Sequence, residues 1–327
     1  MPIDISVVIP TLNREKTLKR VLQALIDQEY PKDRYEIVVV DDGCTDRTEE
    51  MVGGMMGSCK IGFRTCPNIT YVKQTPDKKG PAAANNLGIK TATGKYILFM
   101  NDDVIADKNL IAEHMKTHEE YSKGGFQTRL NDIIVQGRVI NTSSLEDLGK
   151  KTEGYQGGYS DLSFGYFTTW NCSVAKELLE KAGLFDEDFR DLCWEDVEFG
   201  YRLRKLGVKQ KYNKAAFGYH FRHEFSLKQL DRVRTKSVNM GRNAMIYYRK
   251  HPTFDVKIST ESFWLPMLLR WKLSLIIRLI GKKRIMAYLE KLEKQKRYRL
   301  FAFLVGLSGK YWYWTGVRDS LYSQRST

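Results

Sequence analysis

Val39-Val-Asp-Asp-Gly43 and Leu98-Phe-Met-Asn-Asp-Asp103 are two short apolar runs that each end abruptly in a pair of carboxylates. Apolar runs without polar alternation indicate strands of a parallel sheet that is covered on both faces. Carboxylates directly after such strands lie at the carboxyl edge, where open α/β sheets bind their ligands. The two stretches therefore predict an α/β fold with a polar site at one edge of its sheet.

The segments around these two stretches alternate between strand and helix patterns. Predicted strands cover residues 5–9, 36–40, 70–73 and 96–100, and predicted helices cover 17–28, the segment from Thr45 onward, and 81–90. This alternation predicts a doubly wound, mostly parallel central sheet flanked by helices. A third polar cluster, Pro10 to Arg14, also follows a predicted strand, so three clusters are expected at one edge.

The pattern is less regular after residue 105. We expect helices at 173–182, 197–206 and 228–249, short strands at 208–212 and 215–219, and loops around irregular strands at 131–165. We place a domain boundary near residue 255, so that residues 1–255 form the α/β domain. Residues 256–327 then form a basic, aromatic helical extension.

The net charge of +14 is concentrated in this extension, where residues 262–327 hold 14 Lys and Arg against 3 Asp and Glu. A basic segment favours an anionic membrane surface, an acidic polymer or nucleic acid as partner. No zinc-finger, basic-zipper or RNP pattern is present, so we expect no nucleic acid. Aromatic residues such as Tyr311-Trp-Tyr-Trp314 between basic ones suit a membrane interface. Alternatively, the helices bury them against the α/β domain.

The apolar stretch at residues 263–280 contains Pro266, Arg270, Lys272 and Arg278. Each central basic residue costs about 2.5–3.5 kcal/mol in a spanning helix, so we expect no transmembrane span. Residues 1–10 lead directly into a strand, and we expect no signal peptide. The five cysteines show no CxxC pair, which predicts neither a disulfide framework nor a zinc site. We therefore expect a cytoplasmic protein, with peripheral association at the inner face of the membrane as a further expectation.

Asp102 and Asp103 are the first candidate site. Two adjacent carboxylates cannot both be buried unpaired, and a hard divalent cation suits carboxylate and phosphate oxygens. Such a cation stabilises the charge on a departing diphosphate. The alternative is that the pair caps the following helix. Asp41 and Asp42 present the same choice between capping and binding a ribose or a base N–H.

Glu195 and Asp196 open a predicted helix, where the helix dipole favours acidic residues for structural reasons alone. The functional alternative is a general base that takes a proton from a hydroxyl. His220 follows a predicted strand and could complete a metal site or bind phosphate. His114 and His118 lack a third ligand nearby and are expected at the surface. We also expect Arg202, Arg204 and Lys205 on a solvated helix side.

In this order, the pieces resemble the family 2 inverting glycosyltransferases with a GT-A fold, from about Ile5 to His223. The resemblance rests on seven motifs in register: Val7-Val-Ile-Pro-Thr-Leu-Asn13, Val39-Val-Asp-Asp-Gly43 with Thr45-Asp46, Gly80 through Asn86-Leu-Gly-Ile89, Leu98-Phe-Met-Asn-Asp-Asp103, Asn171-Cys-Ser-Val174, Gly183-Leu-Phe-Asp-Glu187 and Trp194-Glu-Asp-Val-Glu198 with Arg202. No single motif is decisive, but seven in one order are strongly specific.

The resemblance implies a hexosyltransferase that moves a sugar from a nucleotide-sugar, by resemblance a UDP-sugar, to a glycan, lipid-linked or protein acceptor with inversion. It implies a nucleotide-binding half at about 1–105 and an acceptor-binding half at about 106–255. The implied nucleotide-binding residues are Pro10, Thr11, Asn13, Asp42, Asn86 and Asp102. Asp103 and His220 would ligate Mn²⁺ or Mg²⁺. Asp196 would be the catalytic base, with Glu195 orienting the acceptor.

The sequence departs from the family pattern at Asn101, Asn85 and Cys44, where Asp, Arg and Ser are usual. Met267-Leu-Leu-Arg-Trp271 lacks the Gln of a Gln-x-x-Arg-Trp motif, which argues for single addition and against a processive polymerase. Two other functions are alternatives to a transferase. A sugar-nucleotide pyrophosphorylase would need a glycine-rich loop at Pro10 to Arg14, which has no glycine. A non-catalytic carbohydrate-binding relative would not be expected to keep the aspartates.

Overall fold

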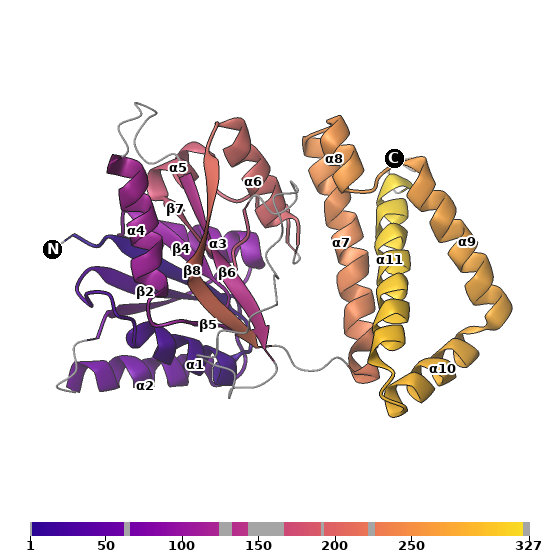
Figure 1. Cartoon of the computed structure of the whole chain (residues 1–327), viewed down its shortest axis with the longest axis horizontal. Coiled ribbons are helices and arrows are strands. Elements are labelled where there is room, and N and C mark those ends of the chain that lie inside the picture. The colour runs from indigo at the N-terminus through magenta and orange to yellow at the C-terminus, as the bar shows by residue number, and fades with distance from the viewer. Residues whose placement is uncertain are drawn as a thin grey trace. The chain divides into compact units, whose positions relative to one another are not determined.

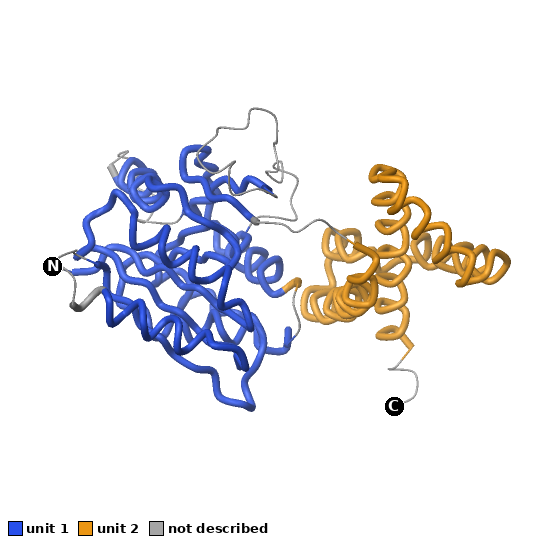
Figure 2. Tube along the Cα trace, turned by 90° about the horizontal axis from the view of Figure 1, so that it is seen from below, with its two compact units in different colours: residues 1–190, 195–223 blue, residues 191–194, 224–327 orange. Residues whose placement is uncertain are grey.

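The chain forms two compact units (Figure 2). The computed structural model describes residues 2–61, 66–123, 133–142, 167–190, 193–221 and 226–322. One unit comprises residues 1–190 and 195–223, and the other comprises residues 191–194 and 224–327. The first is the α/β unit and the second is the helical unit. Helix α7 (Leu230–Lys250) belongs to the helical unit, so the division falls before the expected boundary near residue 255.

The α/β unit is built on one eight-stranded sheet in the order β3-β2-β1-β4-β7-β6-β8-β5 (Figure 1). Its strands are β1 (Ile5–Thr11), β2 (Tyr35–Asp41), β3 (Asn68–Lys73), β4 (Tyr96–Met100), β5 (Val104–Ala106), β6 (Ile133–Thr142), β7 (Asn171–Ala175) and β8 (Lys209–Phe221). Strands β1 to β4 are parallel, as are β6 and β8, whereas β7 runs antiparallel to β4 and β6. The prediction of a mostly parallel α/β sheet is confirmed, with β7 and β5 as the antiparallel strands.

Helices cover both faces of this sheet. They are α1 (Glu15–Ile26), α2 (Thr48–Ile61), α3 (Pro81–Thr91), α4 (Leu110–Lys123), α5 (Lys176–Lys181) and α6 (Glu195–Lys205). Successive residues of a strand point to opposite faces. On β7, Ser173 meets α4, whereas Cys172 lies on the side of α6. Helix α3 packs on β1 so closely that a Cβ at Gly88 would lie 2.3 Å from the Val8 Cγ1 atom.

Four buried phenylalanines join the middle of the sheet to α6. Phe99 of β4 makes edge contacts with Phe167 and Phe185, with ring centroids 5.6 Å apart in both pairs. Phe185 stacks on Phe199 of α6 at 4.4 Å. Aromatic pairs of this kind contribute about 0.5–1.5 kcal/mol each beyond their buried area. This cluster holds the first turn of α6 close to the end of β4.

Two secondary-structure predictions were wrong in the second half of the sheet. Residues 171–175 form β7 instead of starting the helix predicted at 173–182, because they are buried and pair with β4 and β6 on both sides. The two short strands predicted around residue 213 are one strand, β8. The short strand β5 was not expected. Loops around irregular strands were predicted at 131–165, and residues 133–142 do form a strand, β6. The other residues of that range lie outside the described residues.

His114 and His118 are buried, which contradicts their predicted place at the surface. His114 Nδ1 and His118 Nε2 each lie 2.8 Å from the Ser173 hydroxyl, and His114 Nε2 lies 2.8 Å from Asn171 Oδ1. Burial lowers the pKa of His114 to about 4 and of His118 to about 3. Both imidazoles are therefore neutral at pH 7 and bind the polar face of β7 to α4. Their spacing of four residues reflects this shared face.

The helical unit holds α7, α8 (Phe254–Ser259), α9 (Trp264–Ile280), α10 (Lys282–Lys294) and α11 (Tyr298–Tyr322). Figure 1 shows α11 between α7 and α9, and both pack on it. Trp314 is buried, and its indole donates to Glu261 Oε2, while the Tyr313 hydroxyl donates to the Thr260 carbonyl at 2.8 Å. These two aromatics, expected at a membrane interface or against the α/β domain, are buried inside the helical unit itself.

Two further observations bear on the sequence predictions. Among the helices that the structure describes, none is both long and apolar enough to span a bilayer. Cys44, Cys172 and Cys193 are free thiols, but Cys66 is disulfide-bonded, which differs from the expectation of no disulfide.

Helix α11 offers a matched test of the packing on α7. A Cβ at Gly316 would lie 2.0 Å from the Val238 carbonyl oxygen, whereas a Cβ at Gly306 of the same helix would meet nothing within 4 Å. We expect Gly316→Ala to destabilise the protein by at least about 1 kcal/mol through overpacking. Gly306→Ala should instead stabilise it by up to about 1 kcal/mol, because alanine is the better helix former. Urea midpoints measure both, and equal shifts would contradict the close packing.

Candidate active site

The ends of β1, β2 and β4 meet at one edge of the sheet. Strand β1 lies between the other two in parallel register, so all three end on the same side. The Thr11 hydroxyl donates to Asp102 Oδ2 at 2.8 Å, and the Asp42 N–H donates to the Thr11 carbonyl at 3.0 Å. Thr11 thus joins the two carboxylate clusters that the sequence places after β2 and β4.

Burial, with a smaller contribution from the neighbouring Asp103 charge, raises the pKa of Asp102 to about 6. Asp103 lies between two basic side chains. His220 Nε2 is 3.3 Å from Asp103 Oδ1, and the Arg14 guanidinium is 3.6 Å from Asp103 Oδ2. His220 reaches this position because β5 pairs with β8, with Val104 opposite His220.

The arrangement of Asp103 and His220 fits a divalent cation. Two ligands in adjacent positions of an octahedral ion with bonds of about 2.1 Å lie about 3 Å apart, and here the two ligand atoms are 3.3 Å apart. Asn141 Oδ1 lies 2.9 Å from His220 Nδ1, which fixes the ring as second partners of metal-binding histidines do. Within the described ranges, no three His, Cys, Asp or Glu side chains form a metal-binding group. A cation here would therefore take further ligands from substrate phosphates and water.

Asn13 and Asp41 hold the loop that follows β2. Asn13, with φ 54°, accepts the N–H groups of Thr45 at 2.7 Å and Asp46 at 3.2 Å through its side-chain oxygen. Its own N–H donates to Cys44 Sγ at 3.2 Å. Asp41 Oδ1 accepts the N–H groups of Gly43 and Cys44. Burial opposes ionisation of Asp41, but hydrogen bonds from Cys44, Tyr71 and Gly43 lower its pKa on balance.

The Asp42 side chain faces the segment before α3. Its Oδ1 accepts the Gly80 N–H at 2.9 Å, and burial raises its pKa. Gly80 has φ 107°, and a Cβ there would lie 2.2 Å from the Arg190 carbonyl oxygen. Only glycine fits this position, on grounds of both conformation and space. Asp42 is therefore bonded to a glycine that packs against the Arg190 backbone.

Glu195 and Asp196 form the first turn of α6, as predicted. Burial raises the pKa of Asp196 to about 6, although the Val197 N–H donates to Asp196 Oδ1 at 2.8 Å. The Asp196 charge also acts on the buried Cys172 of β7, whose partner on β4 is Phe99, three residues before Asp102. Cys193 and Trp194, directly before α6, have φ of 91° and 79°. Such backbone strain often accompanies functional sites.

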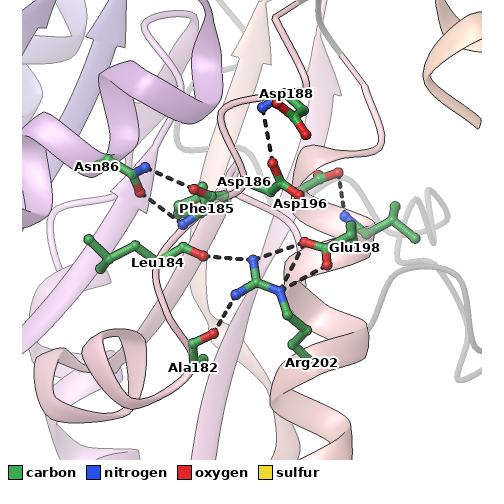
Figure 3. Close-up of polar contacts among 10 residues, drawn as sticks. Asn86, Ala182, Leu184, Phe185, Asp186, Asp188, Asp196, Glu198 and Arg202 are labelled. Carbon is green, nitrogen blue, oxygen red and sulfur yellow. Dashed lines mark hydrogen bonds and ion pairs between the residues drawn. The ribbon is translucent and has the colours of Figure 1, made fainter. Parts of the chain in front are cut away.

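Asn86 and Arg202 hold the turn before α6 (Figure 3). The Asn86 amide donates to the Phe185 carbonyl at 2.9 Å and accepts the Phe185 N–H at 2.8 Å. It also donates to Glu187 Oε1 at 2.9 Å. Both amide hydrogens of Asn86 are thus engaged with residues 185–187. Asn86 therefore positions this turn, and its contact with a nucleotide stays a prediction.

The Arg202 guanidinium binds Glu198 through two nitrogens and also donates to the carbonyls of Ala182 and Leu184 (Figure 3). Its predicted place on a solvated helix side is wrong. Glu198 is buried, and a buried carboxylate needs a partner. The i, i+4 spacing of Glu198 and Arg202 was a signal for this pair, but the two carbonyl contacts come from a distant turn.

A family model described as glycosyl transferase family 2 matches residues 6–179. The chain belongs to glycosyl transferase family 2. Chondroitin synthase of Escherichia coli is 27% identical over 279 residues, which cover 75% of this chain and 39% of that protein. Validoxylamine A glucosyltransferase of Streptomyces hygroscopicus subsp. limoneus is 27% identical over 288 residues, which cover 80% and 58%. This family 2 chain therefore spans less than two thirds of both relatives.

Solved structures show that the fold is GT-A. The mannosyltransferase PcManGT from Pyrobaculum calidifontis, in complex with GDP-Man and Mn²⁺, aligns with a TM-score of 0.62 at 16% identity over 99% of this chain and 90% of that one. TarS from S. aureus, residues 1–349 in complex with UDP-GlcNAc, aligns with a TM-score of 0.51 at 19% identity over 72% and 66%. The predicted family and fold are confirmed.

The Arg202 contacts in this family 2 chain can be tested by a matched pair of substitutions. Arg202→Met leaves Glu198 buried without its cation, and we expect a loss of about 3–5 kcal/mol in the free energy of unfolding. Arg204→Met, two residues along the same helix at an exposed position, should change it by less than about 0.5 kcal/mol. Adding Glu198→Gln to Arg202→Met should recover part of the loss. Urea unfolding measures all three, and equal effects at 202 and 204 would contradict the contacts described.

Proposed function

We propose that this family 2 protein transfers a sugar from a nucleotide-sugar donor to an acceptor hydroxyl with inversion at the anomeric carbon. The observation that carries the proposal is the convergence of Asp103 and His220, 3.3 Å apart, at the strand edge that also holds Asp42 and Asp102. Relatives named as synthases and glucosyltransferases support the reaction class. Family membership favours transfer over the pyrophosphorylase and the non-catalytic alternatives.

The donor would bind at the ends of β1, β2 and β4. Pro10, Thr11 and Asn13 would line the nucleoside pocket, with Asp42 and Asp102 as acceptors for its base or ribose donors. We propose UDP as the nucleotide. Asp103 and His220 would hold Mn²⁺ or Mg²⁺, which when bound neutralises the diphosphate of the donor. Relatives in this fold have been solved with UDP-GlcNAc and with GDP-Man and Mn²⁺.

Asp196 would act as the general base. Its carboxylate would take the acceptor hydroxyl proton while that oxygen bonds to the anomeric carbon and the bond to the diphosphate breaks. A single in-line displacement of this kind inverts the anomeric centre. The raised pKa of Asp196 suits this task, because a base is most effective when its pKa approaches the working pH. Glu195 beside it would orient the acceptor, which can be a glycan, a lipid-linked glycan or a protein.

We also propose that the helical unit associates peripherally with an anionic membrane, at its inner face for a cytoplasmic protein. The excess of Lys and Arg over residues 262–327 supports this.

We propose that the protein adds single sugars. The absence of a Gln-x-x-Arg-Trp motif from the sequence supports this.

Carboxylate-to-amide substitutions separate the two proposed roles. Asp103→Asn should weaken Mn²⁺-dependent donor binding at least about tenfold, because it removes a charged ligand. Asp196→Asn should lower transfer by about 10²–10⁴-fold while donor binding stays unchanged. Asp33→Asn changes an exposed aspartate in the turn before β2, and this control should change neither. Calorimetry with UDP-sugars measures binding, and release of nucleoside diphosphate measures turnover. Unchanged donor affinity in Asp103→Asn would refute the metal assignment.

The pH profile tests Asp196 independently. The base must be ionised, and burial raises its pKa from the ordinary 3.8 to about 6. We therefore expect kcat/KM for transfer to be level above about pH 7 and to fall about tenfold per pH unit below pH 6. Donor binding measured over the same range corrects for titration at the nucleotide pocket. A profile that stays level down to pH 4.5 would rule out this carboxylate as the base.

A further inference from the structure

Helix α9 has an unusual apolar side. It packs on α11 through one side only, and Met267 and Leu273 lie in the core that α11 shares with α7. The opposite side is exposed and carries nine large apolar residues: Trp264, Leu265, Leu268, Leu269, Trp271, Leu275, Ile276, Leu279 and Ile280. Trp264 is 71% exposed and Leu279 is 83% exposed. A contiguous apolar surface of this size marks an interaction site rather than ordinary surface.

Basic residues lie on the exposed side of α9 and next to its carboxyl end, and α9 contains no acidic residue. Lys272 and Arg278 are exposed on α9 itself. Gly281 then turns the chain with φ 84°, and Lys282, Lys283 and Arg284 open α10 at exposed positions. The sequence contains no Asp or Glu from residue 262 to residue 289. An anionic partner is therefore favoured along the whole length of the helix.

The position of Lys272 distinguishes a bilayer from a protein partner. Its spacing places it in the middle of the exposed side, between Leu268 and Ile276. In a dry protein interface this ammonium group would be buried without a counter-charge, and a second copy of the chain would add a like charge. At a bilayer surface, a lysine extends its ammonium group to the headgroups while its carbon chain stays among the lipids.

The length and composition of α9 indicate how it would lie. Its 17 residues extend about 25 Å, less than the hydrocarbon core of a bilayer. Arg270, Lys272 and Arg278 would make a spanning orientation costly. A helix with tryptophans, leucines and flanking lysines lies in the plane of the interface with its apolar side among the acyl chains.

We infer that α9 is a monotopic membrane-binding helix, which inserts Trp264, Trp271 and the leucines between them into an anionic bilayer. Lys282, Lys283 and Arg284 bind the headgroups at its carboxyl end. The inference deepens the membrane association proposed above and names the element and the lipid class responsible. It is independent of the transferase chemistry of the α/β unit.

Flotation of the full-length protein with vesicles tests this directly. Binding to phosphatidylcholine–phosphatidylglycerol vesicles (1:1) should exceed binding to pure phosphatidylcholine vesicles at least about tenfold, and 0.5 M NaCl should weaken it. Leu268→Glu combined with Leu279→Glu should reduce vesicle binding at least about tenfold. The control is Leu206→Glu, the same change at an exposed leucine of the α/β unit, which should bind as the wild type does. Equal binding by the double variant and the control would overturn the inference.

The tryptophans report the depth of insertion. Lipids brominated on the acyl chains should quench the protein's fluorescence in vesicles, and Trp264→Phe with Trp271→Phe should remove most of that quenching. Lys282→Glu with Lys283→Glu, on a polar surface that tolerates charge change, should weaken binding to anionic vesicles alone. Absence of quenching in the wild type would overturn the inference.

Sedimentation velocity distinguishes a second copy of the chain as the partner. The wild type should be monomeric at micromolar concentration without lipid. A dimer that Leu268→Glu with Leu279→Glu dissociates, together with no vesicle binding by the wild type, would overturn the inference. Hydrolysis of the nucleotide-sugar should be the same in these variants as in the wild type. If neither the wild type nor the variants hydrolyse the nucleotide-sugar, the proposed transferase activity is refuted, whereas the membrane role is not affected.

Discussion

The parallel register of β1 between β2 and β4 is the constraint on which the site depends. It brings three strand ends together, so Thr11 can join the carboxylates that follow the other two strands. The same crowding removes water from Asp42 and Asp102, whose pKa values rise as a result. A carboxylate held partly dry at a sheet edge interacts more strongly with cations and donors than one in bulk water. The parallel register of these three strands therefore sets both the order of the sheet and the position of the carboxylates.

Polar side chains around this edge divide into two groups. One group, which includes Asp41, Asn13 and Asn86, forms hydrogen bonds that fix loops. The other group, Asp103 and Asp196, carries the proposed metal binding and the proposed base. The distinction explains why neighbouring aspartates in one motif behave differently. Asp41 accepts the N–H groups of Gly43 and Cys44 and the Tyr71 hydroxyl, and its pKa is lowered. Asp42 accepts the Gly80 N–H, and its pKa is raised by burial.

The first hundred residues could be predicted well from sequence, because buried parallel strands are uniformly apolar and end in polar clusters. Residues 171–175 could not, since Asn-Cys-Ser-Val-Ala has no strand pattern and becomes a strand only through its partners β4 and β6. His114 and Arg202 were misplaced for the same reason: each is buried by polar partners more than fifteen residues away in the chain. The shared place of Thr11 and Asp102 at one edge of the sheet could be predicted because strand ends are visible in sequence. The contacts that fix Asn86 depend on a turn a hundred residues later.

The packing of the loop after β2 affects the reactivity of the Cys44 thiol. Its sulfur accepts the Asn13 N–H and lies 3.6 Å from the Thr11 carbonyl oxygen. Burial, together with the nearby Asp41, raises the pKa of this thiol to about 11. Nucleophilic attack and oxidation require the thiolate, which is scarce at neutral pH under these conditions. The proposed donor pocket should therefore resist alkylating reagents and peroxide although it contains an unpaired cysteine.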